Sequence, residues 1–201
     1  MATHVVKQVD GPSSGKENKF LTFSMAQENY GVEILRVREI IGLIDITPLP
    51  QTPNYVRGVI NLRGKIIPVI ELRTKFGMTS VEYTEETCVI VVEVSEVGIS
   101  ERFEMGVIVD RVNEVLDINE SSIEPAPRFG CSMNTDFILG MAKVKMAERD
   151  RVIILLNIDH VLTTEELNSL SNNSSTANMS ASEITELDQG IDISTPQPTA
   201  A

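Results

Sequence analysis

The chain contains an internal repeat, and this repeat constrains its fold more than any other feature of the sequence. The segment GVEILRVREII at 31–41 matches GVIVDRVNEVL at 106–116, with glycine, valine, arginine, valine and glutamate recurring in register. Two further matches follow in the same order: 55–60 with 137–142, and 65–72 with 151–158. Matches that keep their order along the chain predict two similarly built units. Chance similarity among valine-rich strands is the alternative.

Each unit is predicted to be a small β-barrel. From 19 to 170 the chain is rich in Val and Ile and is interrupted about every 8 to 12 residues by Gly, Pro or Asn, which is typical of short strands. A unit of roughly 75 residues buries little surface alone, so two five-stranded barrels should pack together. We therefore expect a mainly β fold with a barrel boundary near 79–87, short connecting helices and one C-terminal helix in TTEELNSL. The sequence leaves open whether the barrels exchange strands.

The two ends of the chain have compositions that disfavour a packed core. Residues 1–18 contain the run GPSSG and few apolar side chains after Val9, which predicts a flexible leader. Residues 171–201 contain no aromatic residue and few large apolar ones, which predicts a disordered tail. The predicted domain therefore spans 19–170.

The charge of the chain disfavours one class of partner and is unevenly distributed. A net charge of −12 at pH 7 repels a phosphate backbone, so nucleic-acid binding is not expected. Residues 19–78 carry eight cations and five anions, whereas residues 79–170 carry seven cations and 18 anions. Such an asymmetry either orients approaching partners or reflects solvated faces that happen to differ.

The sequence lacks the features of a membrane-inserted or exported protein. No apolar stretch reaches the ~18 residues of a membrane span, and the first residues, MATHVVKQVD, lack the apolar region of a signal peptide. The sequence therefore predicts a cytoplasmic protein without direct membrane insertion.

Side chains suited to catalysis or metal binding are sparse. The two histidines, His4 and His160, are isolated, and Cys88 and Cys131 are too far apart to form a metal motif. The sequence also lacks the glycine-rich and nucleophile motifs of common enzymes. We therefore expect no enzymatic activity, no cofactor and no metal. A small-molecule-binding or enzymatic barrel is the alternative, and it would require a cavity lined by converging polar groups.

The stretch GVINLRGKIIPVIEL at 58–72 places Arg63 and Gly64 between two apolar runs. Gly64 permits a tight hairpin turn, and the forked guanidinium of Arg63 is suited to holding a carboxylate with two parallel hydrogen bonds. Pro68 lacks an N–H group and is therefore expected at a sheet edge or a bulge. An exposed arginine without a fixed partner is the alternative for Arg63.

Several of these segments resemble the CheW family of bacterial chemotaxis coupling proteins. The resemblance rests on FLTFSMAQENYGVEILRVREIIG, on ITPLPQTPNYVRGVINLRGKIIPVIELRTKFGM, and further along on VIVDRVNEVLDI, IEPAPRFG, DFILGMAKV and RVIILLNIDHVL. It covers about residues 20–163. No kinase core, phosphotransfer helix or receiver domain accompanies these segments, which favours a stand-alone adaptor.

The resemblance implies two SH3-like five-stranded barrels and a non-catalytic function. Proteins of this family bridge the helical tip of methyl-accepting chemoreceptors to the regulatory domain of the histidine kinase CheA, and other CheW copies in rings are further implied partners. A CheW-type scaffold for a different chemosensory-like signalling system is the alternative. The receptor-binding positions carried over from the family are Val37, Glu39, Gly58 and Arg63. The resemblance also implies that Arg63 pairs with Glu39, and the sequence does not decide between this pair and a direct receptor contact.

Two proline-bounded segments are the implied kinase-binding surfaces. The segment IEPAPRFG contributes Glu124, Arg128 and Phe129. In this segment the acid, Glu124, precedes the two prolines and the base, Arg128, follows them, which is the reverse of the family pattern. Phe129 is either an anchor at an interface or part of the hydrophobic core. The segment 44–50 contributes Ile44, Thr47 and Leu49.

Overall fold

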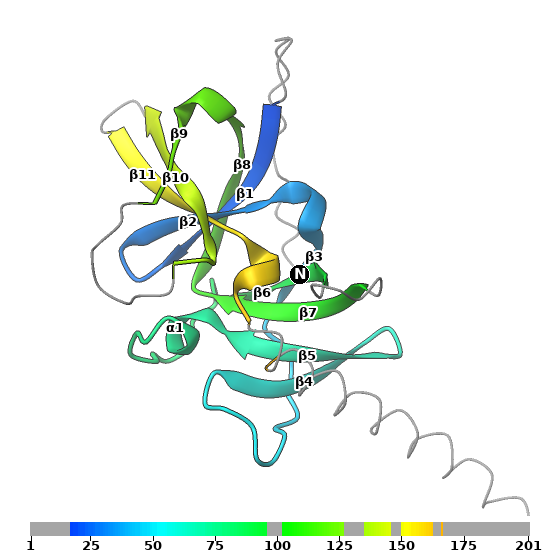
Figure 1. The fold of residues 1–201 in the computed structure, drawn as a ribbon. Coiled ribbons are helices and arrows are strands. Elements are labelled where there is room, and N and C mark those ends of the chain that lie inside the picture. Colours follow the sequence, from blue (N-terminus) through cyan, green and yellow to red (C-terminus); the bar gives the residue numbers. More distant parts are fainter. Residues whose placement is uncertain (1–16, 96–101, 127–134, 146–149, 163–165, 167–201) are drawn as a thin grey trace, which may run out of the picture.

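Two β-sheets make up most of the part of the chain that the computed structural model describes, and in Figure 1 one lies above the other. The described residues are 17–95, 102–126, 135–145, 150–162 and 166. The upper sheet has six strands in the order β8-β1-β2-β11-β10-β9, and the lower sheet has five in the order β3-β6-β7-β5-β4. The mainly β fold predicted from the sequence is confirmed.

The strands are short, and helical turns connect some of them. The six-stranded sheet contains β1 (Glu17–Met25), β2 (Glu28–Glu33), β8 (Arg111–Asn119), β9 (Ile123–Glu124), β10 (Ile138–Lys145) and β11 (Asp150–Leu156). The five-stranded sheet contains β3 (Val37–Gly42), β4 (Val56–Leu62), β5 (Lys65–Glu71), β6 (Cys88–Ser95) and β7 (Arg102–Val109). The helical turns are η1 (Ile34–Arg36), α1 (Leu72–Lys75), η2 (Glu120–Ser122) and η3 (Ile158–His160). Strand β1 begins within the predicted leader, and of the predicted C-terminal helix the structure describes only Glu166, which is helical.

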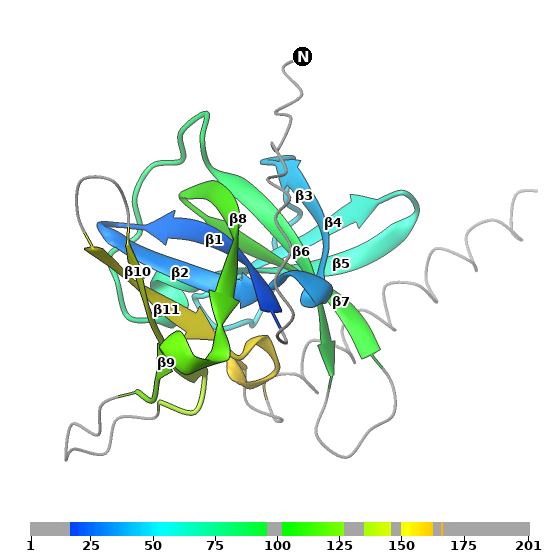
Figure 2. The same cartoon turned by 90° about the horizontal axis from the view of Figure 1, so that it is seen from above.

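Each sheet takes strands from both units of the repeat. Strand β3 follows β2 along the chain but pairs with β6, and β8 follows β7 but pairs with β1, beside which it lies in Figure 2. Strands that match in sequence hold matching places in the two sheets: β2 and β7, β3 and β8, β4 and β10, β5 and β11. The repeat therefore corresponds to two similar sheets, each of which takes two strands from one unit (β1 and β2, or β6 and β7) and the rest from the other unit. Residues 79–87, where the sequence predicted a boundary, lie between β5, the last strand of the first unit, and β6, the first strand of the second, and both strands belong to the five-stranded sheet.

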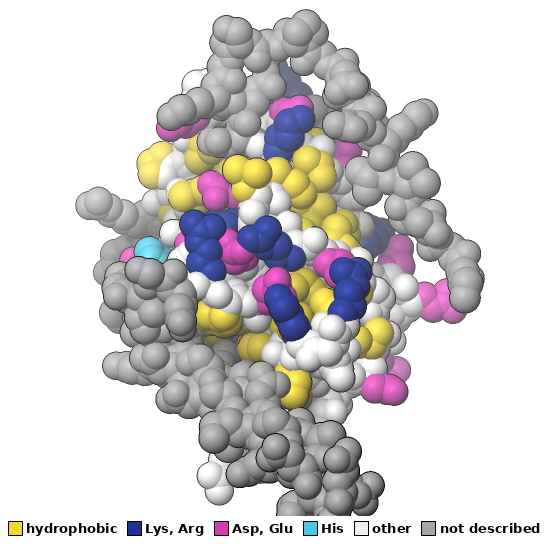
Figure 3. Space-filling model, turned by 90° about the vertical axis from the view of Figure 1, so that its right-hand side faces the viewer, with side chains coloured by type: hydrophobic (Ala, Val, Ile, Leu, Met, Phe, Trp, Pro, Cys, Tyr) yellow, Lys and Arg dark blue, Asp and Glu magenta, His cyan; other side chains and the backbone are white. Residues whose placement is uncertain are grey.

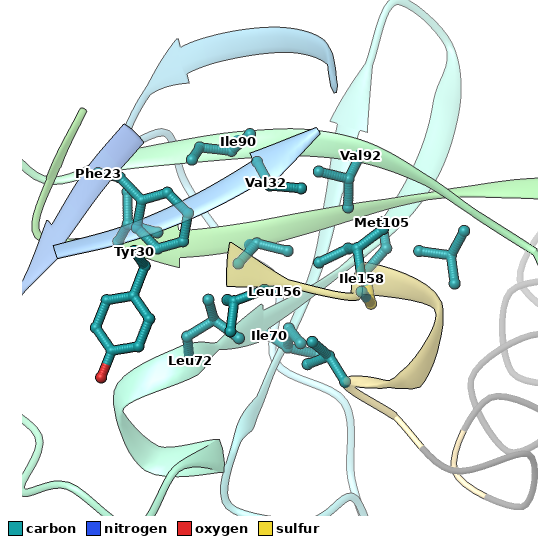
Figure 4. Close-up of a cluster of buried hydrophobic side chains, with 14 of the residues drawn as sticks. Phe23, Tyr30, Val32, Ile70, Leu72, Ile90, Val92, Met105, Leu156 and Ile158 are labelled. Atoms are coloured by element: carbon teal, nitrogen blue, oxygen red, sulfur yellow. The ribbon is translucent and has the colours of Figure 1, made fainter. Parts of the chain in front are cut away.

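The exchanged sheets share a central hydrophobic cluster. It combines Phe23 and Tyr30 of the six-stranded sheet with Ile70 and Val92 of the five-stranded sheet (Figure 4). Each sheet also has a smaller cluster of its own. Strand β6 contributes to two clusters, because successive side chains of a strand point to opposite faces: Val91 packs within its own sheet and Val92 in the centre. Packing between the sheets thus joins the two units.

Pro68 lies in an interior strand, so of the two predicted positions, a sheet edge or a bulge, the edge is not found; the register between β4 and β5 shifts beside it, between Val56 and Gly58. Strand β5 is flanked by β4 and β7. Pro68 is opposite Val59 of β4, and the parallel ladder with β7 begins one residue later, where Val69 pairs with Gly106. Because no pair between β5 and β7 involves Pro68, its missing N–H removes no hydrogen bond from that ladder.

An ion pair is found at each point where the chain changes sheet. Asp110, between β7 and β8, accepts hydrogen bonds from Nε and an amino group of Arg73 in α1, both at 2.7 Å. The N–H of Ala26 in the β1–β2 turn donates to the same carboxylate at 2.8 Å. At the other crossing, Arg36 of η1 binds Asp159 of η3. Both crossings therefore have an arginine–aspartate pair. The crossing segment supplies the aspartate in one pair and the arginine in the other.

We expect Asp110 to make the stability of the protein depend on pH. Burial alone would raise the pKa of Asp110, but the hydrogen bonds from Arg73 and from Ala26 outweigh it and hold this pKa below the ordinary value of 3.8. A carboxyl group of this kind stabilises the fold above its unfolded pKa, and the contribution is lost as the pH falls through the folded pKa. Asp110→Asn should therefore lower the free energy of unfolding by roughly 1–3 kcal/mol at pH 7, and by less as the pH falls below about 4.

Urea unfolding of both proteins across this pH range measures the effect. Asp117→Asn is the matched control, because Asp117 forms an exposed pair with Lys19 at 3.4 Å and should change stability by less than about 0.5 kcal/mol. An equal loss of stability for Asp110→Asn at pH 7 and at acidic pH would contradict the role of the charge.

Candidate functional site

A two-residue turn joins β4 to β5 and carries Arg63. Leu62 pairs with Lys65, and between them Arg63 and Gly64 have φ angles of 54° and 88°. Two successive residues with positive φ form a type I′ hairpin turn. The side-chain oxygen of Asn61 accepts a hydrogen bond from the Gly64 N–H at 2.9 Å. The turn predicted at Gly64 is therefore present, and Arg63 itself adopts a left-handed conformation.

Arg63 binds Glu39 of β3. A guanidinium nitrogen donates to Glu39 Oε1 at 2.6 Å. The pair lies at the surface, where a single ion pair contributes about 0–1 kcal/mol, while a left-handed residue with a Cβ costs about 1–2 kcal/mol. The pair at most offsets this strain, so its main effect is to hold the hairpin tip next to β3.

The hairpin tip and β3 border a hollow of about 220 Å³, which we name the hairpin hollow. Its lining combines charged and apolar side chains: Arg38, Glu39, Leu62, Arg63, Lys65, Val91 and Glu104. Figure 3 shows the side of the molecule toward which the β4–β5 hairpin projects in Figure 1. Basic and acidic side chains are interspersed there with hydrophobic ones, so this face offers both charge and apolar contact.

The cations around the hairpin hollow are more exposed than the acids that bind them. Lys65 lies 3.4 Å from Glu104, and Glu93 binds Arg38 as well as Arg102. The exposed fractions are 79%, 72% and 64% for Arg63, Lys65 and Arg102, against 29%, 12% and 30% for Glu39, Glu93 and Glu104. A partner therefore meets positive charge first, on a chain whose net charge is −12.

The other two predicted receptor positions, Val37 and Gly58, also have a role in the packing of the fold. Val37 is partly buried and packs against the central cluster. Gly58 is buried with a φ of 138°, and a Cβ there would lie 2.0 Å from the carbonyl oxygen of Thr47. Thr47 and Val59 exchange two backbone hydrogen bonds of 2.9 Å beside it. Gly58 therefore lets the segment after β3 close onto β4.

The two predicted kinase-binding segments occupy equivalent positions in the two sheets. Thr47 bridges Val59 of β4, and Glu124 of β9 pairs with Met141 of β10. The sequence contains a corresponding signal that was not among the repeat matches given above: Ile-Thr-Pro-Leu-Pro at 46–50 matches Ile-Glu-Pro-Ala-Pro at 123–127. The repeat thus extends to both proline-bounded segments.

Exposure differs among the predicted kinase-binding residues. Ile44 and Thr47 are exposed, whereas Leu49 is half-buried. Glu124 is exposed and forms a 2.8 Å pair with Lys143. Arg128 and Phe129 lie outside the described residues.

The described residues show no site suited to metal binding or nucleophilic catalysis. No group of three or more His, Cys, Asp or Glu side chains within them could hold a metal ion. Burial raises the pKa of the Cys88 thiol, which keeps it protonated and poorly nucleophilic at neutral pH. Among the helices of the described part, none is long and apolar enough to cross a membrane.

The described residues form two similar β-sheets with a shared hydrophobic cluster and a surface hollow beside the β4–β5 hairpin. Residues 19–166 match the model of the CheW-like domain, and the chain therefore belongs to this family. It is 37% identical to the chemotaxis protein CheW of Klebsiella aerogenes over 162 residues, which cover 81% of this chain and 90% of the relative. It is 32% identical to CheW of Rhizobium meliloti over 154 residues, covering 77% and 92%.

A solved structure is also similar to this one. The crystal structure of the scaffolding protein TtCheW from Thermoanaerobacter tengcongensis matches with a TM-score of 0.64 and 37% identity, over 75% of this chain and 97% of that one. Proteins of the CheW family are non-catalytic scaffold adaptors. The prediction of a chemotaxis adaptor without enzymatic activity is therefore confirmed by family membership.

Gly58→Ala should destabilise the protein by roughly 2–4 kcal/mol, because the new Cβ would collide with the Thr47 backbone and the φ of 138° is strained for any other residue. Gly42→Ala is the matched control: apart from its own residue and its two chain neighbours, no atom lies within 4 Å of a Cβ built there, so its effect should stay within about 0.5 kcal/mol. Urea unfolding measures both, and equal effects would contradict the structural role of Gly58.

Proposed function

We propose that this protein couples the cytoplasmic helical tip of a chemoreceptor to the regulatory domain of the histidine kinase CheA. The observation that carries the proposal is the ion pair between Arg63 and Glu39, which holds the β4–β5 hairpin against β3 at 2.6 Å. This pair contributes little net stability, yet it shapes a hollow on the surface. Binding of a partner is the function that such a hollow suits.

The hairpin hollow has the properties that an amphipathic helix requires of its binding surface. Leu62 and Val91 supply apolar contact, and exposed cations surround them. An amphipathic helix presents an apolar stripe with polar side chains on either side, and such helices bind in grooves of matching character. The helical tip of a methyl-accepting chemoreceptor is the partner proposed for this surface.

The kinase surface proposed for this protein consists of the two proline-bounded segments. Ile44 and Thr47 are exposed on the first segment and Glu124 on the second, and Leu49, Arg128 and Phe129 complete the proposed set. Because the segments occupy equivalent positions in similar sheets, one chain offers two related surfaces. Partners built from similar barrels, including the CheA regulatory domain and further copies in rings, would suit such a repeated surface.

The proposed coupling is a cytoplasmic function. The protein would act at the inner face of the membrane, where it is recruited through receptors rather than by inserting into lipid.

Arg63→Ala should abolish or strongly weaken binding of the receptor tip while the free energy of unfolding changes by less than about 1 kcal/mol, because the pair is exposed. Titration calorimetry with a receptor helical hairpin measures the affinity, and urea unfolding measures the stability. Lys19→Ala is the control, since Lys19 forms a similarly exposed pair on the six-stranded sheet. Unchanged receptor affinity in a folded Arg63→Ala protein would refute the assigned role.

The combination Glu39→Arg with Arg63→Glu separates the two roles left open for Arg63. Restored receptor binding would mean that the ion pair shapes the hollow, because the swapped charges can still pair. Continued loss would favour a direct contact between the Arg63 guanidinium and the receptor.

Ile44→Asp should weaken binding of the CheA regulatory domain at least tenfold and leave receptor binding unchanged. Ile44 is exposed in the loop after β3 and is not part of the hairpin hollow. A charge at the centre of an apolar contact is desolvated without a partner. Val152→Asp is the control, because Val152 is a similarly exposed apolar residue on β11 of the other sheet. If both variants reduced the affinity for the CheA regulatory domain equally, the assignment of the kinase contact to the loop after β3 would be wrong.

A further inference from the structure

We propose that the acidic C-terminal tail of this chain docks in the hairpin hollow and competes there with an incoming partner. The docking segment is EITELDQGIDI at 183–193, which lies outside the described residues. The docking itself depends only on the hollow and the tail. Its consequence, regulated access of a receptor tip, rests on the proposed function.

The charges of the tail and of the hairpin hollow are complementary. Residues 167–201 contain four acidic side chains and no Lys, Arg or His. All four acids fall within the proposed docking segment: Glu183, Glu186, Asp188 and Asp192. The exposed charges around the hollow are the guanidinium and ammonium groups of Arg38, Arg63, Lys65 and Arg102, since the glutamates that bind them are largely covered. The acidic segment therefore meets its opposite charge on this face.

The docking segment also carries apolar side chains at a regular spacing. Ile184, Leu187 and Ile191 follow the i, i+3, i+7 pattern of one helix face. The hairpin hollow offers Leu62 and Val91 as apolar partners between its cations. The segment thus combines the two properties, acidic and amphipathic, that this surface selects.

The tail is long enough to reach the hollow from the last described residue. The carboxylate of Glu166 is held by Lys75 Nζ at 2.6 and 2.8 Å, which anchors the start of the tail to α1. Residues 167–182 would then act as a tether that spans at most about 53 Å when extended and about 20–24 Å on average when flexible. A domain of this size has a radius of gyration of about 15 Å, so the tether does not restrict the docking segment to the face where it begins.

A second surface, at the hollow lined by Arg57, Val81 and Tyr83, fits the tail less well. Arg57 is its only cationic lining residue and is bound by the buried carboxylate of Glu71 at 2.6 Å. Glu82 lies on the same lining and would repel an acidic segment. The hairpin hollow is therefore the docking site that charge favours.

A tethered segment needs only weak intrinsic affinity. A flexible tether of this length holds its segment at an effective concentration of the order of 1 mM. An intrinsic dissociation constant between about 0.1 and 1 mM would then fill the hollow in half or more of the molecules and weaken a competing partner about two- to tenfold.

Charge reversal in the full-length chain tests the proposal. In the triple variant Glu183→Lys, Glu186→Lys and Asp188→Lys, the backbone amide resonances of residues around the hollow, including Glu39, Gly64 and Lys65, should shift relative to wild type. The affinity for a receptor helical hairpin should rise about two- to tenfold. The matched control exchanges the same acids conservatively, Glu183→Asp, Glu186→Asp and Asp188→Glu, and should match wild type in both measurements.

The outcomes separate this inference from the proposed function. Unchanged resonances around the hollow in the charge-reversed protein would overturn tail docking, even if the receptor hairpin binds. Shifted resonances without any receptor binding would support the docking and contradict the receptor role. Shifts that appear only as the protein concentration is raised would assign the tail to a second copy and overturn docking within one chain.

Discussion

The ion pairs at the two sheet crossings are the contacts on which the rest of this fold depends. Each sheet takes two strands from one unit and the rest from the other, so the chain crosses between the sheets twice and each crossing must be held at a defined place. Arg73 binds both oxygens of Asp110 with parallel hydrogen bonds, and Arg36 binds Asp159 at the equivalent crossing. These pairs are only partly exposed, which makes charge-assisted hydrogen bonds stronger than on the open surface. The central hydrophobic cluster then packs between sheets whose connections are already aligned.

The candidate site depends on the order of strands in the five-stranded sheet. Glu39 on β3 and Arg63 on the β4–β5 hairpin both belong to the first unit of the repeat, and they lie at opposite ends of the order β3-β6-β7-β5-β4. Strands β6 and β7 of the second unit lie between them in this order, and the Arg63 guanidinium binds Glu39 at 2.6 Å. The Thr47 bridge to Val59, made possible by Gly58, fixes the segment that follows β3. The hairpin hollow and the first proline-bounded segment therefore both depend on the position of β3 and of the segment that follows it.

Much of this could be predicted from the sequence, and the failures have physical causes. The turn at Gly64 was predictable because positive φ is a local property of glycine. The sequence left the position of Pro68 open between an edge and a bulge, because the end of the ladder between β5 and β7 depends on a distant strand. The sequence did not predict that Arg38, Lys65 and Glu104 line the hairpin hollow, because charged residues that alternate with apolar ones along a strand are also typical of an ordinary solvent-exposed face. The equivalence of 46–50 and 123–127 was present in the sequence as a shared Ile-x-Pro-x-Pro pattern.

The sequence by itself determined the local features: a twofold repeat of short strands, a tight turn beside Arg63 and a tail that has acidic but no basic residues and few large apolar ones. The tertiary structure decided which sheet each strand joins and which carboxylate Arg63 binds. Strands β3 and β8 match each other in sequence, so either could have paired within its own unit or across to the other. Long-range packing and the paired charges at the crossings, which no local pattern contains, select the exchanged arrangement.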